Sequence, residues 1–269
     1  MEIIGTIPLH DEPTVLRATR YSRAGASRVV PQDTQGETML AVYVNDVLTM
    51  QLACSASHLV ELVLGRLFTE GIIASADEVD ALSVCEQSMR ADVALRDGRE
   101  PDLSRGARRI VATCCSNNIT LNEYFAEYSG LSPVAPIEWD PSWVFSVADE
   151  FAQDNTSHAR TWGSHSAYLA DRGGLLFVRE DIGRHNALDK VVGSALLDGV
   201  DLAQCLLFTS GRVPIDMTVK AIRAGVPILV SKGAATDKAV DLARSMGLTL
   251  ICMASPETFC VMTETPNAS

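Results

Sequence analysis

Residues 165–190 read HSAYLADRGGLLFVREDIGRHNALDK, and this stretch decides the fold. Ser166 to Ala170 and Leu175 to Arg179 are largely apolar runs on either side of an Arg172-Gly173-Gly174 turn, which predicts two neighbouring strands. A helix is expected from Ala187 to Leu197, directly after a polar run. The stretch therefore predicts two strands followed by a helix.

The same alternation continues to residue 252. Short apolar runs alternate with segments of helical spacing, and a proline in the first turn or a glycine after the last turn bounds the helices. Such alternation predicts a sheet with parallel portions covered by helices. The expected strands are Leu206–Thr209, Pro227–Val230 and Leu248–Cys252, and the expected helices are Pro214–Ala224 and Asp237–Met246.

Upstream of residue 165 the sequence is richer in strands. Thr38–Val44 and Val47–Ala53 are separated by Asn45-Asp46, a pair that tolerates positive φ and so predicts a hairpin. Further short strands are expected, and the last of them leads directly into a pair of cysteines. These strands are Glu78–Val84, Ala91–Arg96 and Arg108–Ala112.

Two helices are expected in the same part of the chain. The first can be capped by Ser55 or Ser57 and ends at Gly71, where a left-handed residue is expected. The second extends from Ser142 to Asp154 and is capped and amphipathic. Their apolar faces consist of Leu59, Leu62, Val63 and Leu67 in the first helix and Trp143, Val147 and Phe151 in the second.

These patterns divide the chain into three parts. Residues 1–36 are polar and irregular, and we expect them to form an N-terminal arm or an early strand. Residues 37–140 are expected to form a β-rich portion with one helix and the cysteine loop. Residues 141–269 are expected to form an α/β domain, which begins after a connection rich in proline.

Composition and charge limit the possible functions. Hydrophobic residues make up 47% of the 269 residues, which is enough for a substantial core. The net charge of -12 argues against a nucleic-acid partner, because duplex affinity comes mainly from Lys and Arg that neutralise phosphates. Seven scattered cysteines do not resemble a disulfide framework and indicate a reducing compartment.

No membrane insertion is expected either. No run approaches the roughly 18 uninterrupted apolar residues that a membrane helix needs, and the N-terminus lacks a basic start followed by an apolar run. We therefore expect a cytoplasmic protein.

The pair Cys114-Cys115 is the first candidate for chemistry. It follows Arg108 and Arg109 and precedes Ser116-Asn117-Asn118, so two thiols would lie in a loop beside positive charge. Nearby cations lower a thiol pKa, and the thiolate is the form that attacks sulfur, which suits disulfide exchange or persulfide carriage. Two small residues, one of them facing the core, are an equally good local interpretation, so other residues must decide.

A metal site is not expected. The chain has no Cys-x-x-Cys and no His-Glu-x-x-His, and its five histidines are dispersed. The segment around His165 faintly resembles the His-x-Glu of zinc deaminases, but Ala167 stands where the glutamate would be, and no Pro-Cys-x-x-Cys follows. His165 is then either a donor to a ligand or a hydrogen-bonded core histidine.

Three polar loops at expected strand ends are the second candidate. Residues 180–190 form the densest polar run and lie before a helix, whose N-terminus offers N–H groups to an anion. A well-capped solvent face is the alternative, but sites gather at strand ends in such folds, so we favour a ligand. Thr209 to Arg212 has the same arrangement, and Ser231-Lys232-Gly233 would be a third loop, although Lys232 could equally be a surface charge.

The sequence resembles the FdhD formate dehydrogenase accessory proteins. The resemblance covers most of the chain from about residue 36, and the run Gly183-Arg184-His185-Asn186-Ala187-Leu188-Asp189-Lys190 is highly specific. The other matching segments are Leu40–Val44 with its hairpin, Glu70-Gly71-Ile72-Ile73, Ser210-Gly211-Arg212, Ala224 to Leu229 and Ala239 to Leu250.

This resemblance implies a cytidine-deaminase-like mixed sheet with flanking helices, a smaller β-rich N-terminal portion, and a homodimer. It also implies a sulfurtransferase. A cysteine desulfurase loads sulfur onto a loop cysteine as a persulfide, and the sulfur passes to the bis-molybdopterin guanine dinucleotide cofactor that formate dehydrogenase needs. The protein would then hold this cofactor as cargo, with no catalytic metal of its own.

Two positions depart from the family pattern. The family's loop typically reads Cys-x-x-Cys, and matching Cys115 to its first cysteine puts Asn118 at the place of the second. Cys114 could substitute, although adjacent cysteines form only a strained ring when oxidised. After the last strand, where the family commonly has an arginine and glycine turn, this chain has Met253-Ala254-Ser255-Pro256-Glu257-Thr258.

The sequence thus predicts a sulfur carrier and cofactor chaperone with Cys115 as the persulfide-bearing nucleophile and Cys114 as its auxiliary. A protein that binds the cofactor or a guanine nucleotide without sulfur transfer is the first alternative, and a thiol-dependent redox enzyme is the second. The residues expected to hold the cofactor are His165, Arg184, His185, Asn186, Ser210, Gly211, Arg212, Met253, Ala254, Ser255, Pro256, Glu257 and Thr258.

Overall fold

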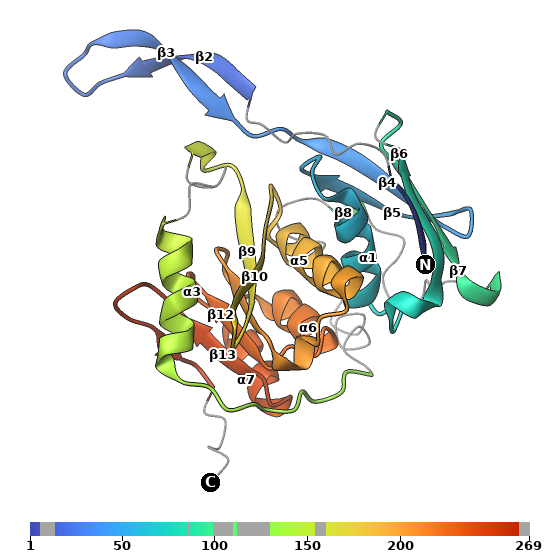
Figure 1. Ribbon diagram of the computed structural model, residues 1–269. Helices are drawn as coiled ribbons and strands as arrows, with labels where there is room; N and C mark the ends of the chain where they lie inside the picture. The colour runs from blue at the N-terminus through green and yellow to red at the C-terminus, as the bar shows by residue number, and fades with distance from the viewer. Residues whose placement is uncertain (6–13, 86, 99–109, 112–129, 154–159, 264–269) are drawn as a thin grey trace.

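Two six-stranded mixed sheets lie on either side of a layer of helices (Figure 1). The computed structural model describes residues 1–5, 14–85, 87–98, 110–111, 130–153 and 160–263. A separate two-stranded hairpin projects from this body (Figure 1). No helix among the described residues is long and apolar enough to cross a membrane.

The C-terminal sheet has the strand order β10-β9-β11-β12-β13-β14. Its three central strands β11, β12 and β13 are parallel, and antiparallel strands extend it on both sides. All four residues of each central strand are buried, as expected for a sheet covered on both faces. The strands are β9 (His165–Asp171), β10 (Gly174–Asp181), β11 (Leu206–Thr209), β12 (Ile228–Ser231), β13 (Thr249–Cys252) and β14 (Cys260–Val261).

Helices cover both faces of this sheet. Helices α5 (Arg184–Asp198), α6 (Ile215–Arg223) and α7 (Asp237–Ser245) pack on one face around Leu169 and Leu207. Helix α3 (Pro141–Gln153) packs on the other face, and its Val147 and Phe151 confirm the predicted apolar side. The parallel alternation predicted from the sequence is therefore confirmed.

The N-terminal sheet has the strand order β1-β6-β7-β4-β5-β8, with helix α1 (Leu59–Thr69) packed on it. Asn45 and Asp46 have φ values of 46° and 64° between β4 and β5, as their tolerance of positive φ predicted. The strands are β1 (Glu2–Gly5), β4 (Thr38–Val44), β5 (Val47–Cys54), β6 (Val79–Cys85), β7 (Arg90–Leu95) and β8 (Ile110–Val111). The short 3₁₀ helices are η1 (Ala76–Glu78), η2 (Arg96–Gly98) and η4 (Leu202–Gln204).

The predicted cap of α1 is wrong. His58, in the left-handed conformation, is the N-cap, and it makes no side-chain capping bond. Ser55 instead binds the C-terminal half, because its backbone N donates to Asp181 and its hydroxyl accepts from the backbone N of Ile182. Gly71, with φ of 75°, does follow the helix as predicted.

Residues 1–5 and 14–36 are also more regular than their polar sequence suggested. Strand β1 joins the N-terminal sheet beside β6, and β2 (Thr14–Tyr21) pairs with β3 (Ser27–Thr34) over eight residues. Only two isolated strands form this hairpin, so no buried face imposed an apolar alternation on its sequence. The arm is therefore a β-ribbon and not an irregular segment.

Helices α1 and α5 cross at two glycines and join the two halves of the molecule. A Cβ placed on Gly65 would lie 1.8 Å from the backbone O of Asp189, and one on Gly193 would lie 1.9 Å from the backbone O of Glu61. Each helix therefore rests directly on the backbone of the other, which only glycine permits.

The mixed α/β sheet with flanking helices and a β-rich N-terminal portion is thus confirmed. The closer likeness to cytidine deaminases stays a prediction, as does the division at residues 36 and 140. The crossing of α1 on α5 shows that helix packing extends across the second of these boundaries.

Replacing either glycine at the crossing should unfold the protein readily. We expect Gly65→Ala to lower the free energy of unfolding by about 3 kcal/mol or more, because overpacking against backbone cannot be relieved by a side-chain movement. Urea titration followed by circular dichroism measures this change. Gly173→Ala is the matched control, since its new methyl group would meet only the carboxylate of Asp171 at 3.1 Å. Equal stability of the two variants would contradict the account.

Candidate functional site

The polar loops predicted at the strand ends lie together at one edge of the C-terminal sheet. Strands β11, β12 and β13 are parallel, so the segments that follow them leave the sheet at the same edge. Strand β9 begins and β10 ends at this edge, because β9 is antiparallel to both β10 and β11. We call the residues at this edge the strand-end cluster: His165, Arg184, Ser210, Gly211, Arg212, Lys232 and Gly233.

His165 and Ser210 form the first contact of the cluster. The Ser210 hydroxyl lies 3.3 Å from Nδ1 of His165 and accepts a hydrogen bond of 3.0 Å from the backbone N of Ser166. Because the hydroxyl oxygen already accepts, its proton can be donated to the imidazole. The serine thereby fixes the orientation of the histidine ring beside the end of β11.

Gly211 lets Arg184 approach the strand ends. A Cβ on Gly211 would lie 3.0 Å from Cβ and Cδ of Arg184 and 3.5 Å from Nδ1 of His165. Arg184 is the first residue of α5, so its side chain reaches from the helix start across to β11. The 180–190 and 209–212 loops are therefore neighbours in the structure.

The loop after β12 completes the contact surface. Gly233 lies against the backbone of Arg212, and the Ser231 hydroxyl donates a 2.7 Å hydrogen bond to the carbonyl of Gly211. The backbone N atoms of Met253 and Ala254 donate to the carbonyls of Gly233 and Ser231. The segments after the three parallel strands are thus hydrogen-bonded into one continuous edge.

Three cations lie at this edge. Burial alone would raise the pKa of the Asp216 carboxyl group, but its hydrogen bonds and the nearby charges, that of Arg184 among them, hold this pKa below its usual value. Arg184 is half-buried, and the side chains of Arg212 and Lys232 are exposed. Among the described residues, two buried donors at the edge have no hydrogen-bond partner, Nε of Arg184 and the hydroxyl of Ser166. Unsatisfied buried donors are rare in proteins, and cations beside them favour an anionic ligand.

The loop between β13 and β14 closes on itself. The Ser255 hydroxyl accepts hydrogen bonds from the backbone N atoms of Glu257 and Thr258 and lies 2.9 Å from the Glu257 carboxylate. Ala254 is buried, whereas Met253 and Pro256 are exposed. Within the described part of the chain, this loop adds no cation to the edge, which agrees with the departure noted in the sequence.

His185 and Asn186 point elsewhere. Nε2 of His185 lies 2.9 Å from the carboxylate of Asp216 on α6. Asn186 is buried, and its amide donates to the carbonyl of Ala53 and to Asp181. The structure therefore does not bring these two side chains into the cluster, and their contact with a cofactor stays a prediction.

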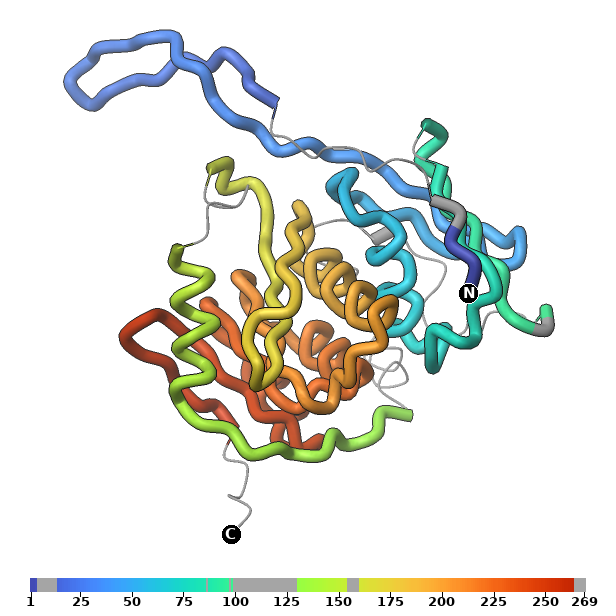
Figure 2. The backbone as a smooth tube through the Cα atoms, in the orientation of Figure 1, coloured from blue at the N-terminus to red at the C-terminus, as the bar shows by residue number. Residues whose placement is uncertain are grey.

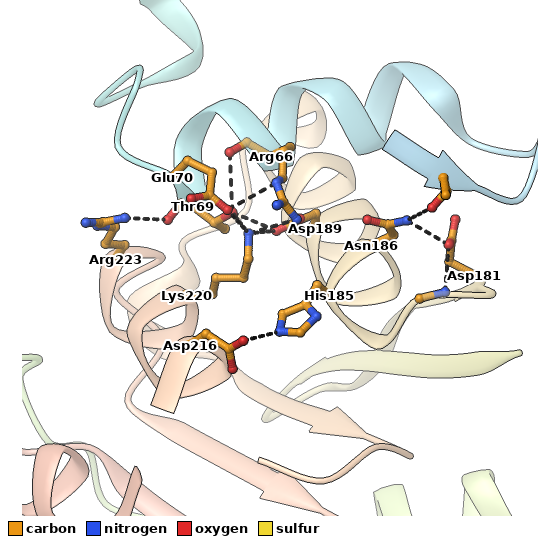
Figure 3. A network of polar contacts seen from close by, with 12 residues as sticks. Arg66, Thr69, Glu70, Asp181, His185, Asn186, Asp189, Asp216, Lys220 and Arg223 are labelled. Carbon is orange, nitrogen blue, oxygen red and sulfur yellow. Dashed lines mark hydrogen bonds and ion pairs between the residues drawn. The ribbon is translucent and has the colours of Figure 1, made fainter. Parts of the chain in front are cut away.

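Two buried ion networks hold the cluster in place, and Figure 3 shows Asp181 of the first network with its neighbour Asn186. In the first, Lys190 Nζ lies 2.8 Å from Asp181, which also accepts hydrogen bonds from the backbone N atoms of Ser55 and Gly183. Lys190 and Asp181 are fully buried, so neither charge is stable without the other. This network ties the turn before α5 to the end of β5.

The second network surrounds Asp189 at the helix crossing (Figure 3). Its carboxylate accepts hydrogen bonds from Arg66 at 3.1 Å, Thr69 at 2.6 Å and Lys220 at 2.9 Å. Glu70 lies 3.1 Å from Arg66 Nε and 2.9 Å from Lys220 Nζ. Helices α1, α5 and α6 are therefore joined by one group of paired charges.

Electrostatics in this network favour the ionised form of Glu70. Burial alone would raise the pKa of this carboxyl group, but the nearby charges of Lys220 and Arg66 outweigh it and hold the pKa well below its usual value of 4.5. The network therefore contributes stability only while Glu70 is ionised.

The cysteine pair Cys114-Cys115 lies outside the described residues, as does Asn118. Strand β8, which ends at Val111, pairs with β5 in the N-terminal sheet. Burial raises the pKa of Cys205 to about 12 and that of Cys252 to about 11, so these thiols stay protonated at neutral pH.

Sequence reasoning missed the residues that hold the site. Asp181, Asp189 and Lys190 were read as part of a ligand-binding run, yet all three are buried and paired. Asp181 and Lys190 pair with each other over nine residues, so this pair was within reach of sequence reasoning. The α1 partners of Asp189 were not, because Thr69 lies 120 residues and Arg66 lies 123 residues away in the sequence.

The depressed pKa of Glu70 predicts an acid-sensitive network. Below the usual pKa of 4.5, the unfolded chain binds a proton that the native Glu70 does not bind, so stability falls by about 1.4 kcal/mol per pH unit from this group. Glu70→Gln lacks this dependence. We expect the stability difference between wild type and Glu70→Gln to shrink between about pH 6 and about pH 3 in urea titrations. A constant difference would show that Glu70 is not held ionised.

Comparisons with known proteins agree with this architecture. Residues 35–268 match the FdhD/NarQ family. The sulfur carrier protein FdhD of Bacillus subtilis strain 168 is 31% identical over 258 residues, which is 95% of this chain and 97% of that protein. The protein of the same name from Geobacillus kaustophilus is 32% identical and covers 84% of this chain and 86% of its own length.

A solved structure shows the same fold. A crystal structure described as a formate dehydrogenase accessory protein from Desulfotalea psychrophila superposes with a TM-score of 0.78 at 25% identity, over 95% of this chain and 98% of that one. The family match covers nearly all of the chain from residue 35, including the strand-end cluster, the C-terminal sheet and all strands of the N-terminal sheet except β1. This chain belongs to the FdhD/NarQ family.

Proposed function

We propose that this chain is a cytoplasmic, homodimeric sulfur carrier that serves formate dehydrogenase. It would accept sulfane sulfur on Cys115 from a cysteine desulfurase and pass it to a bis-molybdopterin guanine dinucleotide cofactor held as cargo at the strand-end cluster. The observation that carries this proposal is the cluster itself, in which Arg184 lies at Gly211 beside two buried donors without partners, and Arg212 and Lys232 follow β11 and β12 at the same edge. Relatives named sulfur carrier proteins support it.

The cluster fits an anionic nucleotide cargo. Each guanine nucleotide end of the cofactor carries a diphosphate, and arginine binds phosphate oxygens through two parallel N–H groups. The chain has a net charge of -12, so such a ligand needs a local concentration of cations, which this edge provides. His165 and the hydroxyl of Ser210 add neutral hydrogen-bonding groups next to those cations.

Sulfur loading requires only a thiolate at Cys115. The thiolate attacks the terminal sulfur of the desulfurase persulfide, the S–S bond of the donor breaks, and the donor cysteine leaves as a thiolate. Cys115 then carries the persulfide. The preceding Arg108 and Arg109 would favour its ionised form.

Release of the sulfur as sulfide requires two further electrons. A second thiol supplies them when it attacks the Cys115 sulfur and forms a disulfide while the terminal sulfur leaves. Asn118 stands where the family has its second cysteine. In this chain, Cys114 or an external thiol would fill that role.

Asn118 also supports a second candidate function. A protein without a resolving cysteine could bind and deliver the guanine-dinucleotide cofactor while another protein handles the sulfur. In that case, the double variant Cys114→Ala/Cys115→Ala would still restore formate dehydrogenase activity in a strain that lacks this protein. Under the sulfur-carrier proposal, the double variant restores none.

Persulfide formation should depend on Cys115. After incubation with a cysteine desulfurase and labelled cysteine, we expect one 32 Da adduct on Cys115 and label that reducing agents remove. Cys115→Ala should abolish the label. Cys85→Ala and Cys260→Ala are the matched controls, because these two thiols are exposed and free in the described part of the chain. Labelling that survives Cys115→Ala unchanged would refute the assignment.

Nucleotide binding should depend on the two arginines of the cluster. We expect Arg184→Ala and Arg212→Ala each to weaken GDP binding about tenfold or more in calorimetric titrations, because each removes a charged hydrogen-bond donor to phosphate. Lys238→Ala, on the exposed side of α7, is the control and should bind like wild type. Equal affinity of all four proteins would place the nucleotide elsewhere.

A further inference from the structure

The N-terminal hairpin is a two-stranded ribbon with little support from the body. Strands β2 and β3 pair from Thr14 with Thr34 to Tyr21 with Ser27, and the ribbon extends away from the sheets (Figure 2). We call residues 14–34 the arm. A hairpin of two strands is at best marginally stable alone in water, and stable ones have a third strand or a packed face. We therefore expect the arm to be covered by another molecule.

The most exposed apolar side chains of the molecule belong to the arm and to one neighbouring residue. Among the described residues, five large hydrophobic side chains are more than half exposed. The exposed fraction of every other large hydrophobic side chain is at most 49%. Tryptophan and tyrosine are the residues that most often dominate binding interfaces. The five are Trp162 at 88%, Tyr21 at 76%, Val29 at 65%, Val15 at 60% and Leu16 at 51%.

The arm is also the basic part of an acidic protein. Its four arginines and Asp33 give residues 14–34 a net charge of +3 within a chain of -12, so the remaining residues carry -15. Arg20 and Arg28 are direct partners in the ladder. Like charges directly opposite each other destabilise a hairpin, and a carboxylate placed between them would relieve the repulsion. The four arginines are Arg17, Arg20, Arg23 and Arg28.

The base of the arm contacts the segment that leads into the strand-end cluster. Asp33 of β3 accepts hydrogen bonds from Arg160 at 3.0 and 3.3 Å, and Gln35 lies against Gly163. Gly163 lies two residues before His165, the first residue of β9. Trp162, between these contacts, has φ of 58°, a conformation that is strained for a bulky side chain.

We propose that the arm and Trp162 together form a docking surface for an acidic protein, the recipient formate dehydrogenase. This inference rests on the proposed function, because it assigns the partner of the same site. A recipient must lie near the cluster from which the cargo leaves, and the arm emerges beside it. Its arginines would pair with carboxylates of the recipient, and Trp162 and Tyr21 would enter an apolar part of its surface.

Charge reversal in the arm tests the docking surface. The variant Arg20→Glu/Arg28→Glu keeps the same repulsion within the ladder, so the hairpin itself is no less stable. Arg172→Glu/Lys238→Glu is the matched control, since it changes the net charge equally at exposed positions outside the arm. The probe is purified apo formate dehydrogenase from the same organism, immobilised for kinetic measurement at low and at high salt.

We expect the arm variant to associate at least tenfold more slowly than wild type at low salt, with a smaller salt dependence. The control should stay within twofold of wild type. Trp162→Ala should dissociate at least tenfold faster. Binding that is the same for all variants, or no binding of wild type to the apoenzyme, would overturn the proposal.

Light scattering on the same proteins tests the rival occupant, a second copy of this chain with its acidic body. A smaller oligomer for the arm variant alone would mean that the arm binds another copy, and the proposal would fail. The docking result is also separate from sulfur transfer. Arm variants should still load sulfur on Cys115, whereas failure of loading in the wild type would refute the sulfur carrier and leave the binding measurement intact.

Discussion

The structure depends on the crossing of helices α1 and α5. Only glycine fits at two positions of this crossing, and a buried aspartate there must be paired with cations. Gly65 and Gly193 let α1 and α5 touch through their backbones, and Asp189 then lies buried between the cations of α1 and α6. An unpaired buried carboxylate would be strongly destabilising, so Arg66 and Lys220 must stay in place once the helices have met. The crossing thus fixes the angle and the depth at which the N-terminal sheet meets the C-terminal one.

This crossing also positions the strand-end cluster. Helix α5 starts at Arg184, and its first turn is held by Asp181, which binds the backbone of Ser55 in the other half of the molecule. Arg184 can therefore reach Gly211 only because both networks hold the helix start against the sheet edge. Strand β8, which leads toward the cysteine pair, belongs to the N-terminal sheet that the crossing holds. The helix crossing therefore holds both β8 and the proposed cargo site in place.

The sequence predicted the helices and strands better than the contacts between them. Apolar runs predicted the strands of the C-terminal sheet, and Asn45-Asp46 predicted the β4-β5 hairpin of the N-terminal sheet, because both signals are local. Helix α5 begins three residues before the predicted Ala187, since Gly183 provides no side-chain cap to mark the start. The links that Asp189 and Asn186 make to the N-terminal half could not be predicted, because Arg66 and Ala53 lie more than 100 residues away from them. The strand-end cluster was predicted correctly in its two arginine loops, since parallel strands bring their ends to one edge.

The central claim is that sulfur on Cys115 reaches a cargo held by Arg184 and Arg212. Transfer of labelled sulfur in a single turnover tests it most directly, with preloaded protein mixed with the guanine-dinucleotide cofactor and a thiol reductant. The account predicts that the label leaves Cys115 for the cofactor in the wild type, and that Arg184→Ala/Arg212→Ala loads normally but transfers at least tenfold more slowly. Transfer at the wild-type rate in this double variant would contradict the account.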